Sequence, residues 1–397
     1  MTRADVFPAK VSHLGRAITC AFCTGLIGVG LARFAYTPLL PAIINAHWFA
    51  PSEAAYLGAA NLAGYLAGAL LGRPISARFS LVGLVRTMML LATASFFACG
   101  FPLSFSWFFI WRFAAGFAGG AMMVLAAPTV LAHVPPSRRG LAGGLIFMGV
   151  GSGVVASGTL VPFLLQIGLR ETWLGLGALS LVLTAVAWSG WPISPPPQLP
   201  APEHAHAPHL SALRALYVEY ALNAAGWVPH MIFLVDFISR GLGKGVEIGA
   251  MVWVVFGISA TFGPILSGHV ADRIGFGPAL RAAFALEIAA IAIPAFNITN
   301  LPLLFISSGI VGAFLTGTVT LVLGRIHELL PHHPQEQKAA WSVATIAFAL
   351  CQAGAAYGLS FVFAHTGGNY QLLFAIGAVA MTLSLAIDLM FDREPVR

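Results

Sequence analysis

Long apolar stretches recur along the whole chain, and they limit its fold more than any other feature. Runs of about 18 or more apolar residues, each a candidate membrane span, are separated by short loops that carry Pro, Gly and charge. Only 9% of the 397 residues are charged, which is too little to cover the surface of a soluble protein of this length. Lipid cannot satisfy an open backbone, so each run must be a helix. The sequence therefore predicts an all-α membrane protein that crosses the bilayer many times.

Twelve spans are predicted, in two groups of six. Their approximate ranges are 15–44, 53–72, 82–101, 106–131, 140–166, 172–191, 212–238, 246–270, 278–298, 301–325, 339–364 and 369–390. The segment between the sixth and seventh spans, residues 192–211, is rich in Pro and is expected to be a stiff polar linker. The predicted domains are therefore an N-terminal six-helix bundle (1–191), the linker, and a C-terminal six-helix bundle (212–397).

The two halves share a register, which indicates an internal repeat. The segment Gly68–Arg73 aligns with Gly268–Arg273 at an offset of 200, without a gap and at the same place in the order of spans. Two similar six-helix halves joined by a linker are the layout of a rocker-switch transporter, whose binding site lies near the membrane midplane between the halves.

The distribution of Lys and Arg predicts the orientation. If the N-terminus is cytoplasmic, fifteen of the twenty Lys and Arg residues lie in loops on the cytoplasmic side and three on the opposite side. Short cytoplasmic loops are enriched in these residues, so both termini are expected in the cytoplasm. The chain contains far more arginine than lysine, which hints at a GC-rich bacterial gene and hence at the bacterial inner membrane.

Several function classes are disfavoured. The formal net charge of +6 is spread over short loops and does not indicate nucleic-acid binding. The four cysteines lie inside apolar runs and predict neither a disulfide framework nor a metal site. The sequence contains no P-loop, and no nucleophile–base pair or metal cluster falls at membrane depth. Neither an ATP-driven pump nor a membrane-embedded enzyme is expected, and no cofactor is implied.

Four ionisable side chains are expected deep within the spans, namely Arg33, Arg112, Glu219 and Glu287. An arginine at the bilayer centre costs about 2.5–3.5 kcal/mol, so such residues usually have a function. The first half offers no deep acid to pair with either arginine. Their partners are therefore expected to be backbone carbonyls, an acid from the second half, or the substrate; the alternative, strongest for Arg112, is that the side chain snorkels.

Three local motifs resemble those of the major facilitator superfamily, and the resemblance extends over essentially the whole chain. Residues 268–275 are similar to the signature loop motif of that superfamily, whereas the first-half copy, residues 68–74, lacks its acidic residue. Residues 111–116 resemble the arginine motif linked to proton coupling. The stretch GLARFAYTPLLP, residues 30–41, is similar to the first-helix signature of the YbfB/YjiJ-type branch. The resemblance implies a monomeric transporter whose spans one, four, seven and ten line a central cavity.

The resemblance also assigns a conformational switch to the loop motif. Gly268 permits close helix approach, as small residues do in membranes. Asp272 is expected to pair with Arg273 or Arg281, or to face the N-terminus of a neighbouring helix, in one conformational state and not in the other. An ordinary pair of loop charges is the alternative.

Span seven carries the strongest pattern for a binding surface. Glu219, Asn223, Trp227 and His230 are spaced i, i+4, i+8 and i+11, which places them within about 80° of one helix face. In the resembled fold this stripe is expected to face Arg33 and Arg112 across the cavity. Glu219 is the expected proton carrier, with a share for His230 and Arg112. The alternative is a polar seam between helices that never touches substrate.

Other residues are expected to complete the site around Arg33. Tyr36 and Thr37 lie three and four residues after Arg33, so a continuous helix would place them on its face. Gln352, in span eleven, is expected to add one hydrogen bond to the substrate. The sequence thus predicts proton-coupled secondary transport of a small molecule, with the arginines favouring a small organic anion. The alternative is proton-coupled efflux of hydrophobic or cationic compounds, with Glu219 and the aromatic side chains as the binding surface.

Overall fold

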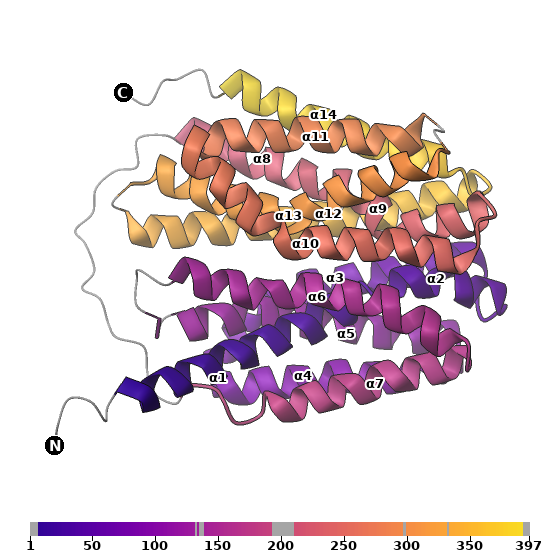
Figure 1. Ribbon diagram of the computed structural model, residues 1–397, viewed down its shortest axis with the longest axis horizontal. Helices are drawn as coiled ribbons and strands as arrows, with labels where there is room; N and C mark the ends of the chain where they lie inside the picture. The colour runs from indigo at the N-terminus through magenta and orange to yellow at the C-terminus, as the bar shows by residue number, and fades with distance from the viewer. Residues whose placement is uncertain are drawn as a thin grey trace.

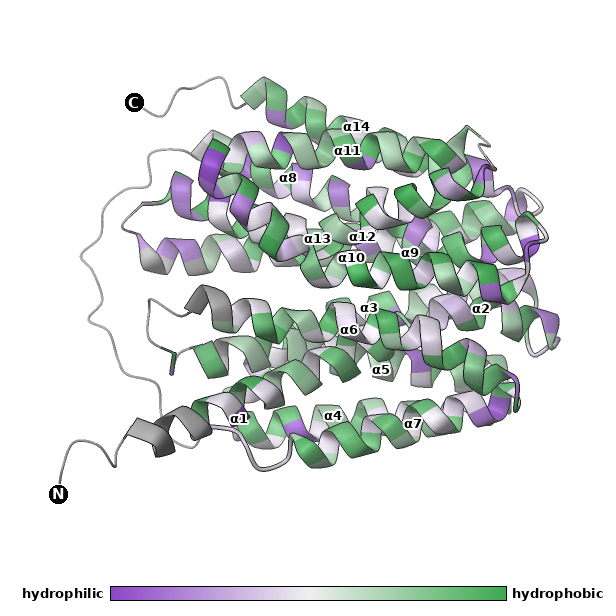
Figure 2. Ribbon diagram, viewed as in Figure 1, coloured by the Kyte–Doolittle hydropathy of each residue, from purple (hydrophilic) through white to green (hydrophobic). Residues whose placement is uncertain are grey.

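The computed structural model describes residues 7–131, 133–134, 139–192, 210–296, 299–331 and 333–391, and these residues form an all-helical protein. Within them, twelve helical segments are long and apolar enough to cross a membrane, as predicted. Figure 2 shows hydrophobic residues along the length of the helices and hydrophilic residues concentrated near the helix ends and in the connections. This distribution is the one that a bilayer imposes on a bundle of spanning helices.

The first half contains the first six spans. The first span is made of α1 (Phe7–Gly25), the π-helix η1 (Leu26–Leu31) and α2 (Tyr36–Asn45). The next five spans are α3 (Pro51–Ser76), α4 (Leu81–Cys99), α5 (Phe105–Leu131), α6 (Arg139–Leu165) and α7 (Leu169–Val186).

The second half repeats this plan. The seventh span is made of α8 (Leu210–Gly226), α9 (Val228–Asp236) and the π-helix η3 (Phe237–Gly241). The remaining spans are α10 (Gly245–Ile274), α11 (Phe276–Ala295), α12 (Leu301–Leu329), α13 (Pro334–His365) and α14 (Tyr370–Phe391). Figure 1 shows α1 to α7 and α8 to α14 as two stacked groups of helices. Most of the predicted linker, residues 193–209, lies outside the described residues.

Small residues bring equivalent helices close together in each half. In the first half, a Cβ atom on Gly64 or Gly68 of α3 would collide with backbone carbonyls of α5. In the second half, Gly263 of α10 and Gly312 of α12 lie against the backbone of each other's helix in the same way. Close backbone approach through small residues is the usual way to pack helices in lipid, where apolar surface gives no driving force for association.

The start of α1 and the end of α14 lie at the same end of the molecule, on the left in Figure 1. We call this the terminal end and the other the distal end. Among the described residues, contacts between the halves lie at the midplane and toward the distal end. There α2 contacts α9, α3 contacts α13, and α6 contacts α10. Two such contacts are the hydrogen bond from the Trp253 indole to the Ser157 hydroxyl, at 3.1 Å, and the ring pair of Tyr56 with Tyr357. The halves are therefore joined at the distal side of the midplane.

Candidate functional site

Helix breaks in spans one and seven face each other where the halves meet. In span one, α1 gives way to η1, and a turn at residues 32–35 precedes α2. In span seven, α8 ends at Gly226, Trp227 adopts ψ near 0°, and α9 starts at Val228 with a proline at its beginning. Because α2 contacts α9, the two breaks lie opposite each other. Paired discontinuous helices at the midplane expose backbone groups and are a common place for a transporter's binding site.

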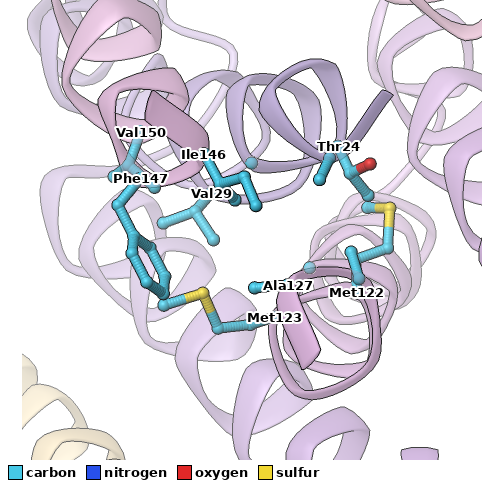
Figure 3. Close-up of a pocket in the computed structure, with 12 residues that line it drawn as sticks. Thr24, Val29, Met122, Met123, Ala127, Ile146, Phe147 and Val150 are labelled. Carbon is cyan, nitrogen blue, oxygen red and sulfur yellow. The ribbon is translucent and has the colours of Figure 1, made fainter. Parts of the chain in front are cut away.

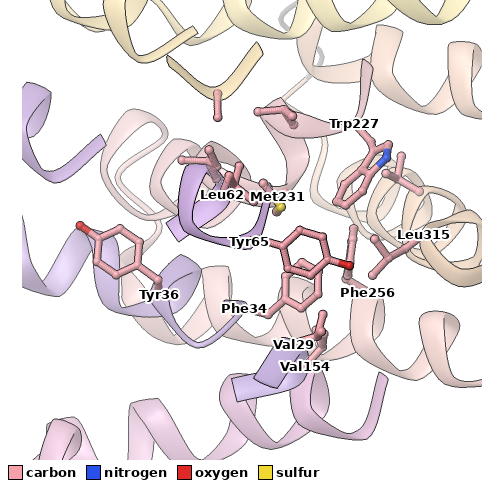
Figure 4. Close-up of a cluster of buried hydrophobic side chains, with 14 of the residues drawn as sticks. Val29, Phe34, Tyr36, Leu62, Tyr65, Val154, Trp227, Met231, Phe256 and Leu315 are labelled. Atoms are coloured by element: carbon pink, nitrogen blue, oxygen red, sulfur yellow. The ribbon is translucent and has the colours of Figure 1, made fainter. Parts of the chain in front are cut away.

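Arg33 lies in the break of span one and reaches across to span seven. Its Nε and Nη2 atoms lie 3.3 and 3.2 Å from the sulfur of Met231. The guanidinium also lies over the rings of Phe34, Tyr65 and Trp227, at 5.2, 5.1 and 5.6 Å from their centroids. Figure 4 shows these rings and Met231 gathered at the junction of the two halves.

Within the part of the chain that the structure describes, the charge of Arg33 has no anionic partner. The side chain is buried, with 7% of its surface exposed. Among the described residues, no carboxylate forms an ion pair with it. A thioether sulfur is a weak acceptor, and ring faces attract a cation by roughly 0.5–2 kcal/mol each. The N–H edge of Arg33 is therefore available for a stronger acceptor, and a carboxylate can accept two parallel hydrogen bonds from it.

Arg112 fixes the break in span one. Its Nη1 donates a hydrogen bond to the carbonyl of Ala32 at 2.8 Å, and its guanidinium lies 4.3 Å from the ring centroid of Tyr36. The Asn61 amide donates to the same carbonyl at 3.3 Å and to that of Arg112 at 3.1 Å. The predicted backbone-carbonyl partner is confirmed, and the snorkelling alternative is wrong because only 2% of Arg112 is exposed.

Of the two residues expected beside Arg33, Tyr36 turns away from it, whereas Thr37 reaches the same residue of span seven. The Tyr36 hydroxyl donates to the carbonyl of Ala54 at 2.6 Å, and Figure 4 shows its ring apart from the cluster around Tyr65. The Thr37 hydroxyl donates to the backbone carbonyl of Met231, so it joins the two halves. Thr37 and Arg33 therefore meet the same residue of span seven, as a shared face predicts, whereas Tyr36 does not. The substrate contact of both residues stays a prediction.

Of the polar stripe on span seven, Trp227 alone contacts Arg33. Asn223 donates to Oε2 of Glu287 in α11 at 2.8 Å and to the sulfur of Met381 in α14 at 3.2 Å. The Nε2 of His230 is 2.8 Å from the Ser307 hydroxyl in α12. These side chains occupy seams inside the second half, as the alternative interpretation stated. The expected geometry, facing Arg33, is wrong for both.

Glu219 lies nearer the terminal end, also inside the second half. Its side chain is buried, and it lines a small pocket with Arg325 of α12 and Asp388 of α14. Asp388 forms an ion pair with Arg281 of α11. Glu219 therefore faces a group of charged side chains and not Arg33, which corrects the expected geometry. Its role in carrying a proton stays a prediction.

Gln352 is buried in α13. Its Nε2 atom has no hydrogen-bond partner among the described residues. It lies one helical turn after Phe348, whose ring centroid is 6.0 Å from that of Trp227. Phe348 thus links α13 to the break in span seven, and the contact of Gln352 with substrate stays a prediction.

The expected switch residues lie near the terminal end of α10. Gly268 is half-buried, whereas Asp272 and Arg273 are exposed. A Cβ atom on Gly268 would meet only a methyl group of Thr320, at 3.9 Å, so this glycine is not in tight contact here. Neither Asp272 nor Arg273 forms an ion pair among the described residues. Their role as a switch stays a prediction.

Comparison with known proteins identifies the family. A family model described as "Uncharacterised MFS-type transporter YbfB" matches residues 25–389. The chain belongs to this family. The "Uncharacterized MFS-type transporter YceJ" of Bacillus subtilis (strain 168) is 25% identical over 376 residues, which cover 90% of both chains. The predicted resemblance is thereby confirmed.

Solved structures of MFS transporters share the fold of this transporter. A bacterial homolog of the human lysosomal transporter Spinster, in an inward-facing and occupied conformation, is similar with a TM-score of 0.68 and 18% identity, covering 97% of both chains. The xylose transporter XylE from E. coli, in a partially occluded inward open conformation, is similar with a TM-score of 0.72 and 14% identity, covering 97% of this chain and 98% of that one. The all-α MFS fold is thus confirmed.

Arg33, Phe34, Tyr65, Trp227 and Met231 form a group that we call the midplane cluster, and the sequence interpretation missed two of its residues. Met231 lies four residues after Trp227, so helical spacing could have pointed to it. Tyr65 lies in span two, which the central-cavity assignment left out, and no pattern in the sequence marks it. Its ring contacts the Arg33 guanidinium because α3 packs closely on α5 beside the break in span one.

An apolar pocket lies next to this cluster, within the first half. It is formed by α1, η1, α5 and α6, and its lining includes Val29, Met122, Met123, Phe147 and Val150 (Figure 3). Thr24 also lines it, but the Thr24 hydroxyl already donates to the carbonyl of Cys20 at 2.6 Å. The pocket therefore offers mainly apolar contacts to an occupant.

Proposed function

We propose that this transporter moves a small organic anion by alternating access, with Arg33 binding the anionic group. The observation that carries the proposal is the buried guanidinium of Arg33 at the junction of the halves. Among the described residues it meets a thioether and ring faces but no carboxylate. Burying a charge at this depth in a membrane protein is costly, so buried charged residues usually bind a substrate, move an ion or form an ion pair. A substrate carboxylate would supply the missing partner.

The position of Arg33 also supports a link between binding and conformational change. Arg33 belongs to the first half, whereas Met231 and Trp227 belong to the second. A substrate that takes the place of the Met231 sulfur would exchange a contact between the halves for a contact with itself. Such a differential contact is what a ligand needs in order to shift the balance between two conformations.

We further propose that the proton gradient drives transport and that Glu219 carries the proton. The support is its burial near Asp388 and Arg325, toward the terminal end of the transporter. Buried intramembrane carboxyl groups are common members of proton relays. In this proposal Arg112 and His230 hold the helices around the site through their bonds to Ala32 and Ser307.

The proposed location is the bacterial inner membrane, with the terminal end in the cytoplasm and the transporter acting as a monomer. The excess of Lys and Arg in loops on this side supports the orientation. With this orientation, the conformation described here is closed toward the outside, because the halves join at the distal side of the midplane.

The test is the thermal stability of the purified protein in detergent with small anions, small cations and lipophilic compounds. A ligand at one hundred times its dissociation constant stabilises the state it binds by about 2.7 kcal/mol. Organic anions should raise the melting temperature of the wild type but not of Arg33→Gln. The matched control is Arg170→Gln, since Arg170 also lies over a ring, that of Phe101, but at the distal surface. Stabilisation by lipophilic cations alone would replace the anion proposal with efflux.

Proton coupling has its own test in proteoliposomes. The wild type should acidify or alkalinise the lumen as an organic anion moves, as read by an enclosed pH dye. Glu219→Gln keeps the size of the side chain and removes its titration, so it should still exchange anion across the membrane but should not move protons. If this variant moved protons at the wild-type rate, Glu219 would not be the carrier.

A further inference from the structure

The midplane cluster carries one positive charge among its described side chains, which limits the charge of its ligand. Arg33 supplies this charge at the junction of the halves. Arg112 is committed elsewhere, because its guanidinium bonds the Ala32 carbonyl and lies over Tyr36. A dianion would bring a second charge beside Arg33, and among the described residues no second cation faces the cluster, because the guanidinium of Arg112 is directed at Ala32 and Tyr36. Burying an unpaired charge is costly.

The surroundings of Arg33 are aromatic and apolar. Three ring centroids lie within 5.6 Å of its guanidinium carbon. The ring of Phe34 also packs against that of Trp253, with 5.9 Å between their centroids. The free polar groups in or beside this cluster are few. Among the described residues they are the Tyr65 hydroxyl, the Nε2 atom of Gln352, and, next to the break in span one, the Oδ1 atom of Asn61 and the Nε atom of Arg112. A ligand with many hydroxyl groups would leave most of them without partners, whereas a flat apolar body would match the rings.

The apolar pocket extends this surface away from Arg33. Val29 lines the pocket and belongs to the same buried cluster as Phe34, Tyr65 and Trp227. It lies one helical turn before Arg33, and Figure 4 shows it beside Phe34 and Val154. Met123 and Phe147 line the pocket beyond it (Figure 3). An apolar surface therefore begins next to the charge and continues toward the terminal end.

We infer that the substrate is a monoanion with an aromatic or apolar body. Its single anionic group takes the place of the Met231 sulfur on Arg33, and its body packs against Trp227 and Tyr65 and extends toward the pocket at Val29. This inference rests on the proposed function and adds to it the class of anion and the residues that select the body.

The experiment is calorimetric binding to the full-length protein in detergent with four probes. Phenylacetate has one charge and an aromatic body, acetate has the charge alone, succinate has two charges, and 2-phenylethanol has the body alone. Phenylacetate should bind most tightly. Trp227→Leu should weaken phenylacetate binding about tenfold, which corresponds to a lost aromatic contact, and leave acetate binding unchanged. Trp227→Phe should restore most of the affinity for phenylacetate.

The matched control is Trp188→Leu, because Trp188 also lies beside an arginine, Arg86, but is partly exposed at the other side of the first half. It should bind all four probes as the wild type does. Each variant is first checked for a single melting transition and a monodisperse elution profile. A wild type that binds succinate or acetate as tightly as phenylacetate would overturn the inference. Equal loss of acetate and phenylacetate in Trp227→Leu would also overturn it, because Trp227 would then only position Arg33.

The two proposals fail in different ways. If succinate binds best and Arg33→Gln abolishes that binding, the anion function stands and the monoanion inference is wrong. If Arg33→Gln binds phenylacetate as well as the wild type does, the proposed function itself is wrong.

Discussion

Replacing Gly30 by alanine should destabilise the transporter and weaken its binding site together. Gly30 lies in η1, three residues before Arg33, and the backbone of α6 passes directly beside it. A Cβ atom on Gly30 would lie 2.7 Å from the Cα of Gly153 and 3.0 Å from the carbonyl oxygen of Val150. Both neighbours are backbone atoms, so a side-chain rotation cannot relieve the contact.

The structure sets the size of the effect. The contact with Gly153 has to lengthen from 2.7 Å to at least 3.4 Å, where ordinary van der Waals contact begins, so η1 and α6 must move apart. Overpacking of this kind costs about 1–3 kcal/mol. Alanine in a helix recovers up to about 1 kcal/mol relative to glycine. With this recovery the net loss should be up to about 2 kcal/mol, and the displaced η1 should carry Arg33 away from Met231.

The matched control is Gly144→Ala in α6, because a Cβ atom at Gly144 would meet nothing within 4 Å. The thermal unfolding of both variants in detergent is monitored by tryptophan fluorescence. Their binding of an organic anion is measured by calorimetry. Gly30→Ala should melt below the wild type and bind the anion more weakly, whereas Gly144→Ala should melt at or above the wild type with unchanged affinity. Equal melting temperatures for the two variants would refute the argument from close backbone approach.

Three further predictions concern a contact between the halves, a contact at the helix break in span one, and a contact inside the second half. Thr37→Val removes a hydrogen bond between the halves worth about 0.5–1.5 kcal/mol, so the equilibrium constant for closing at the distal end should fall roughly two- to tenfold. Spin-label distances between α2 and α9 measure the two populations, and an unchanged distribution would count against this role. Arg112→Met leaves the Ala32 carbonyl with the Asn61 amide alone and should cost about 1–3 kcal/mol in thermal or denaturant unfolding; wild-type stability would show that the bond does not brace the break. A double-mutant cycle of Asn223→Ala and Glu287→Ala should give a coupling energy of about 0.6–1.7 kcal/mol, and strict additivity would contradict the bond between them.

The candidate site was only partly predictable from the sequence. The position of Arg33 among apolar residues predicted that it lies deep in a span and lacks an acidic partner in the first half. That Arg112 bonds a backbone carbonyl was among the stated alternatives. The sequence did not reveal which helices the polar face of span seven contacts. A helical wheel shows which residues share a face but not which neighbouring helix that face meets. Asn223 and His230 thus share a face that packs against α11, α12 and α14.

By itself, the sequence determined that the chain spans a membrane twelve times, in two similar halves of one transporter family. Hydropathy and local motifs carry that information, because the bilayer acts on each segment separately and requires its backbone to be satisfied within a helix. Only the tertiary structure decided what surrounds the charge at the midplane. Arg33 and Met231 are 198 residues apart, and their contact depends on two helix breaks and on the packing of both halves. Such contacts arise from surfaces distant in the chain, which no local pattern records.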